Sequence, residues 1–171
     1  MTRFTRRGDG VVVLLYASEQ ELLLRLAAQL IELLGQRGQP SPADVLFAQA
    51  GIGGRSAPPL DPALARLLPD AYRDDQEAAS EHRHLTELAL VQRKVENARR
   101  FQNSLRDKAA EAVLDADGIQ SWLRTLTDMR LALAARLQIE VDGDAGTGDD
   151  AMLEIYDWLG YLQGSLLEVL P

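Results

Sequence analysis

The sequence contains no cysteine among its 171 residues. This absence excludes disulfide bonds, thiolate metal ligands, cysteine nucleophiles and all redox chemistry based on thiols. Aromatic residues are also scarce at 5%, whereas leucine and alanine are abundant, and this balance favours helices. No apolar run approaches the roughly 20 residues of a membrane-spanning helix, and the apolar run at 11–16 lacks the pattern of a signal peptide. We therefore expect a cytoplasmic protein with no contact to a membrane.

The residues that are present have the composition of a globular protein, with 46% hydrophobic and 26% charged residues. The length suits a single domain spanning residues 1–171. The formal net charge is −8, so binding to DNA would need a local basic patch. The candidate nucleic-acid patch is Arg3, Arg6 and Arg7. A basic terminus is more often solvated than bound to DNA, so the net charge disfavours DNA as a partner.

The spacing of apolar residues predicts a mainly α-helical fold, namely a compact bundle of about five helices with a small N-terminal β-hairpin. A Gly-Asp-Gly turn between two β-prone runs places the hairpin at 3–16. The helices are expected over 18–34, 61–68, 76–105, 117–138 and 151–170. Residues 111–114 are ambiguous, and we favour a short third strand there.

Two joining segments stand out. Residues 36–59 are rich in glycine and proline, and a short helical turn at 42–50 fits within them. A loop of this length in a compact domain is usually functional or mobile. Residues 142–150 are acidic and glycine-rich, which predicts a flexible turn. At the start of the first long helix, Ser18 and Glu21 have the spacing of a capping box.

Residues 69–75 hold a proline, a tyrosine, an arginine and three acids within one predicted loop. This composition predicts either a structural clasp or a recognition surface. The clasp is favoured, because the proline ends one helix, an acid at 74 or 75 caps the next, and 71–72 fill the join. The candidate interaction or structural residues are Pro69, Asp70, Tyr72, Arg73 and Asp74.

Arg130 falls inside the apolar stripe of the predicted helix 117–138. A buried guanidinium needs a partner, since an unpaired buried charge is costly. Asp157 on the last helix is the candidate partner in a buried ion pair. The alternative is that the Arg130 side chain extends along the apolar surface and leaves its charged head in solvent.

No residues have the pattern of a catalytic, cofactor or metal site. Glu81 and His84 have a spacing known from metal-binding bundles, but a solvated helix face explains them better. The glycine-rich segment 51–56 lacks the flanking strand and helix of a phosphate loop, so a surface loop is favoured. An alternative remains open, in which the protein is an enzyme or binds a small ligand in a pocket under 51–56 reached by Arg55, Tyr72 or Arg73.

The first long helix has only a narrow polar stripe, which predicts that it is central or is covered by a second subunit. A homodimer is the default form of such an association.

Four stretches of the chain occur in an order and spacing that can be compared with known families. They are 61–75, 122–126, 128–137 and 156–159. Together they resemble an actinobacterial family of domains of unknown function, some of whose members are labelled AosR, an oxidative-stress transcriptional regulator. The resemblance covers residues 4–170. It implies a regulatory role with a contact to DNA or, as a protein partner, to the transcription machinery. It also implies redox input through N-terminal cysteines, which this chain lacks. We therefore expect a non-enzymatic regulatory or interaction protein that does not sense oxidants through cysteine.

Overall fold

The computed structural model describes residues 3–39, 45–48, 50, 52–106 and 111–171. In chain order the elements are β1 (Phe4–Arg7), β2 (Gly10–Leu14), α1 (Ala17–Gly35), α2 (Val45–Ala48), α3 (Pro62–Leu67), α4 (Gln76–Arg106), β3 (Glu111–Leu114), α5 (Ala116–Leu137) and α6 (Asp150–Glu168). The prediction of a helical bundle with a small N-terminal sheet is confirmed, and 111–114 forms the third strand. The single turn α2 lies where a short helical turn was expected, although 40–44 fall outside the described residues.

The three strands form one antiparallel sheet in the order β1-β2-β3. Phe4 is paired with Val13, and Val11 with Leu114, so these four buried side chains share one face of the sheet, whereas buried Val12 lies on the opposite face. Gly10 is required where β2 and β3 meet, because a Cβ at this position would lie 2.6 Å from the carbonyl oxygen of Leu114. A side chain there would separate the two strands.

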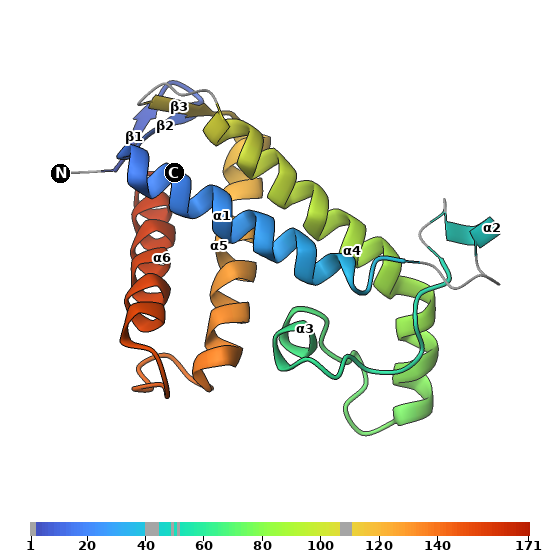
Figure 1. Ribbon diagram of the computed structural model, residues 1–171. Helices are drawn as coiled ribbons and strands as arrows, with labels where there is room; N and C mark the ends of the chain where they lie inside the picture. The colour runs from blue at the N-terminus through green and yellow to red at the C-terminus, as the bar shows by residue number, and fades with distance from the viewer. Residues whose placement is uncertain (1–2, 40–44, 49, 51, 107–110) are drawn as a thin grey trace.

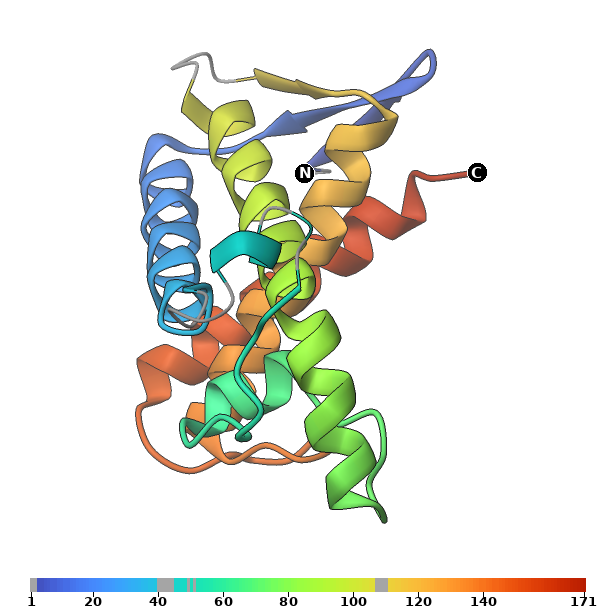
Figure 2. The same ribbon diagram turned by 90° about the vertical axis from the view of Figure 1, so that its right-hand side faces the viewer.

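The sheet lies at one end of the helical bundle, next to the start of α1 (Figure 1). Helix α4 runs from the sheet to the far end of the molecule (Figure 2). Helix α1 packs on α4 and α5, while α6 and α3 pack on α5. The core between them centres on Trp122, whose ring contacts Phe101 and Phe4 at centroid distances of 4.6 Å and 6.0 Å. No described helix has the length and apolarity needed to cross a membrane.

The N-cap of α1 lies two residues earlier than the predicted capping box, at Tyr16 and not at Ser18. The backbone N–H of Tyr16 donates to Oε2 of Glu19 at 2.8 Å, so Glu19 and not Glu21 closes the cap. Ser18 is already inside the first turn and is not the cap. Asp75 caps α4, since its Oδ1 accepts from the Ala78 N–H at 3.0 Å.

Candidate functional site

Four charged side chains meet beside α4, and we call Arg37, Asp70, Arg83 and Glu87 the Glu87 cluster. Glu87 is 3% exposed and Arg37 is 6% exposed. The guanidinium of Arg37 donates to both carboxylate oxygens of Glu87, from Nε at 2.6 Å and from Nη2 at 3.1 Å. Nη2 also donates to the carbonyl oxygen of Ala57 at 2.7 Å. This arrangement satisfies a buried carboxylate and anchors the loop that precedes α3.

Arg83 completes the Glu87 cluster on its outer side. It donates to Asp70 Oδ1 and to the carbonyl oxygen of Ser56, and its Nε lies 3.8 Å from Oε2 of Glu87. Two arginines therefore face two acids, and their contacts hold two separate loops against α4. Sequence reasoning missed Arg37, Arg83 and Glu87. The residue that could have indicated a buried ion pair in the sequence is Glu87. It lies four residues before Val91, which is buried, and therefore on the core face of the same helix.

The candidate residues of the 69–75 segment do not act together. Asp70 contacts Arg83 as a clasp would, whereas Pro69, Arg73 and Asp74 are exposed. Tyr72 is 50% exposed and contacts the ring of His82 edge-on at 5.9 Å. It therefore does not fill the join between the helices, as the clasp interpretation required.

The glycine-rich segment lies directly on α4. The N–H groups of Gly53 and Gly54 donate to the carbonyl oxygen of His84 at 3.3 Å and 2.9 Å. A Cβ on Gly54 would approach the backbone of α4 to 3.3 Å, so a glycine permits this contact. Amides that could have bound a phosphate are thus occupied by the helix.

The alternative function needs a pocket under 51–56, of which residue 51 lies outside the part of the chain that the structure describes. The cavity beside the 69–75 segment has a volume of about 50 Å³ and is lined by Asp70, His82 and Arg83 among others, but not by Arg55, Tyr72 or Arg73. Ligand pockets usually enclose roughly 300–1,000 Å³. This cavity is therefore smaller than a usual ligand pocket.

The predicted pair of Arg130 with Asp157 is wrong. The Arg130 guanidinium lies 4.7 Å from the Tyr156 ring centroid, donates to Gln163 Oε1 at 3.3 Å, and is 3.7 Å from Asp142. The physical reason is helical geometry: residues 156, 160 and 163 of α6 face α5, whereas Asp157 is turned to solvent.

A glycine makes room for Arg130. A Cβ at Gly160 would lie 3.3 Å from three guanidinium atoms of Arg130. Glycine inside a helix costs stability, so its presence needs a reason. In the sequence, Gly160 was the residue that could have indicated that another side chain passes close to α6 at this point.

The three N-terminal arginines make separate contacts. Arg3 forms a 2.8 Å ion pair with Glu19 and lies over the ring of Tyr16, 4.8 Å from its centroid. Arg7 lies 3.9 Å from Glu111, and Arg6 donates to the Gly8 carbonyl oxygen at 3.4 Å. Of the three, only Arg3 is held in a partly buried ion pair, whereas Arg6 and Arg7 remain exposed.

Two further ion pairs join helices to α5. Lys94 of α4 donates to Asp128 at 2.6 Å, and burial raises the pKa of this carboxyl although Lys94 opposes the shift. Arg136 donates to Asp61 at 2.8 Å, at the start of α3. This hydrogen bond lowers the pKa of Asp61 and raises that of Arg136.

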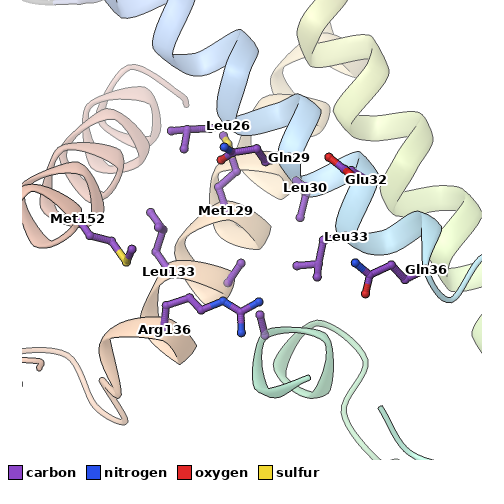
Figure 3. Close-up of a pocket in the computed structure, with 12 residues that line it drawn as sticks. Leu26, Gln29, Leu30, Glu32, Leu33, Gln36, Met129, Leu133, Arg136 and Met152 are labelled. Carbon is purple, nitrogen blue, oxygen red and sulfur yellow. The ribbon is translucent and has the colours of Figure 1, made fainter. Parts of the chain in front are cut away.

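A cavity of about 390 Å³ opens between α1, α3, α5 and α6, and we call it the α1–α6 groove. Figure 3 shows leucines of α1 facing Met129 and Leu133 of α5 and Met152 of α6. Its apolar walls are Leu26, Leu30, Leu33, Ala63, Met129, Ala132, Leu133 and Met152, and its polar rim is Gln29, Glu32, Gln36 and Arg136. A cavity of this size with apolar walls and few polar groups fits a binding site.

The structure defines a mainly helical protein with a small terminal sheet and an apolar groove. Residues 1–170 match the family described as "Domain of unknown function (DUF2017)", and the chain belongs to this family. It is 32% identical to proteins named "Oxidative stress regulator AosR" of Mycobacterium tuberculosis and Mycobacterium bovis over 184 residues, covering 97% of this chain and 84% of theirs. It is 31% identical to the "Putative oxidative stress regulator AosR" of Mycobacterium leprae, covering 87% and 77%. No solved structure matches.

Proposed function

We propose that this chain is a non-enzymatic, cytoplasmic regulator that acts by binding a protein of the transcription machinery in the stress response. The observation that carries the proposal is the α1–α6 groove together with the names of the relatives, which describe regulators. Without cysteine, its regulatory input has to differ from thiol oxidation.

The α1–α6 groove has the chemistry of a protein-binding surface. Leu26 and Leu33 of α1 and Leu133 of α5 are only partly buried, although each lines the groove. Contiguous apolar surface with a polar rim is typical of interaction sites. An apolar face of a partner helix would remove these side chains from water.

The interaction can be tested with purified host RNA polymerase holoenzyme and the tagged chain. Leu33→Glu places a carboxylate in the groove, and Gln92→Glu adds the same charge to the exposed face of α4. We expect the wild type and Gln92→Glu to retain the polymerase. The amount of polymerase retained by Leu33→Glu should fall by a factor of at least about ten, because the new carboxylate would be buried in the interface without a compensating charge. Circular dichroism has to show that all three proteins are folded.

Two results would contradict the proposal: recovery of no transcription component with the wild type, or equal recovery with Leu33→Glu. A gel shift that weakens steeply with salt would instead identify DNA as the ligand.

We also infer a homodimer, supported by the flank of α1 that faces away from the groove. Ala28 is exposed there, and Leu24 and Ile31 are partly buried. An isologous contact through this flank would cover them. Sedimentation velocity should show a dimer for the wild type and a monomer for Ile31→Glu, and a concentration-independent monomer for the wild type would refute the inference.

A further inference from the structure

Two sulfur-containing side chains of this protein line the same cavity. The chain has three methionines and no cysteine, so its only sulfur groups are thioethers. Apart from Met1, they are Met129 and Met152, which are distant in sequence but line the same α1–α6 groove (Figure 3). An oxidant that reaches the groove therefore meets thioethers in an apolar environment.

The two groove methionines differ in access. Met129 is 3% exposed and belongs to the main core, on the floor of the groove. Met152 is partly exposed in the first turn of α6 and packs against a smaller cluster that includes Leu137 and Tyr156. An oxidant in solution can thus reach the Met152 sulfur before it reaches that of Met129.

We propose that Met152 is a reversible oxidation site whose oxidant class is peroxide. Hydrogen peroxide transfers one oxygen atom to the Met152 sulfur: the O–O bond breaks, an S–O bond forms, and water leaves. The sulfur is oxidised by two electrons and the peroxide is reduced. Methionine sulfoxide reductase reverses the change with a thiol reductant. The oxidation itself is inferred from the position of Met152 in the α1–α6 groove. Only its role in regulation rests on the proposed function.

Oxidation at this position alters the packing of α6. A sulfoxide is polar, so it is poorly accommodated between the leucines of α1 and the cluster around Tyr156. Helix α6 packs on α5, and Met152 lies at the end of α6 that bounds the groove. Oxidised Met152 therefore loosens the first turns of α6 and changes the shape of the groove, which is the surface that the proposed partner contacts.

The test uses the purified full chain, Met152→Leu and Met129→Leu, each titrated with hydrogen peroxide. Peptide mapping by mass spectrometry assigns every added oxygen to Met1, Met129 or Met152. We expect Met152 to be oxidised before Met129, faster hydrogen exchange in the first turns of α6, and a thermal midpoint lower by about 2–4 °C. Sulfoxide reductase should restore the midpoint. Met129→Leu should respond as the wild type does, and Met152→Leu should keep its midpoint.

The proposal is overturned if Met152 resists a dose that converts free methionine in the same tube. It is equally overturned if Met152 is converted without a change in exchange or midpoint, or if Met152→Leu loses as much stability as the wild type. None of these results affects the capture of polymerase by untreated protein, so failure here and failure of the proposed function are distinguishable.

Discussion

Replacing Arg37 by Met should destabilise the fold by about 3 kcal/mol, because it leaves the buried Glu87 carboxylate without its closest cation. Methionine preserves the apolar part of the side chain while removing the guanidinium. The lost contacts are those to Glu87 at 2.6 Å and 3.1 Å and to the Ala57 carbonyl oxygen at 2.7 Å. Breaking a buried ion pair costs about 3–5 kcal/mol. The low end applies here, since Arg83 remains 3.8 Å from Glu87.

The assay is urea unfolding followed by circular dichroism, together with the thermal midpoint, which should fall by about 6–12 °C for this loss. The matched control is Arg25→Met, which breaks the exposed 3.1 Å pair with Glu21 and should cost about 0.3–0.5 kcal/mol. The double variant Arg37→Met, Glu87→Leu should recover part of the loss, because it leaves no unpaired carboxylate.

Either of two results would refute this reasoning. The first is a loss below about 1 kcal/mol for Arg37→Met, which would mean that water or Arg83 compensates Glu87 fully. The second is a double variant that is no more stable than the single one.

Lys94→Met removes the cation that opposes the raised pKa of Asp128. A carboxyl with a raised folded-state pKa contributes stability that is full below its unfolded-state pKa and is lost as pH rises through the folded-state pKa. Without Lys94 this loss is larger, so the deficit should be smallest at low pH, where Asp128 is protonated in both folded proteins, and should grow as pH rises through the raised pKa of Asp128. A deficit in the urea midpoint that is constant with pH would contradict this. Gly164→Ala should stabilise α6 by up to about 1 kcal/mol, since open space surrounds it. Gly160→Ala should give no gain, because its Cβ would press on Arg130; equal gains in thermal midpoint would disprove the crossing of Arg130 over Gly160.

The helices could be predicted from the sequence because their signals are local. Aspartates mark the starts of α3, α5 and α6, where the side chains of Asp61, Asp115 and Asp149 each accept a backbone N–H. The 111–114 strand remained ambiguous in sequence, since four residues carry little periodicity. What decides it is pairing with β2, a strand about 100 positions earlier in the chain.

The charged contacts could not be predicted in the same way, because their partners are distant in sequence. Arg37 and Glu87 are 50 positions apart, and no spacing rule connects them. For Arg130, an acid on the neighbouring helix was a reasonable expectation, but the face that an acid occupies depends on how α6 is rotated against α5. Apolar spacing is also misleading at one position of α4: Leu85 lies three residues before buried Leu88 and yet is 48% exposed, whereas Glu87 is buried.

The Glu87 cluster and the α1–α6 groove are linked through the end of α1. Gln36 lies on the rim of the groove, and the next residue, Arg37, is buried against Glu87 on the other side. The ion pair thus fixes the position of a wall of the groove. Arg37→Met, studied well below its thermal midpoint, should therefore oxidise faster at Met152 than the wild type at the same dose of peroxide, whereas Arg25→Met should not. Equal rates for all three proteins would mean that the groove keeps its shape without the Glu87 cluster.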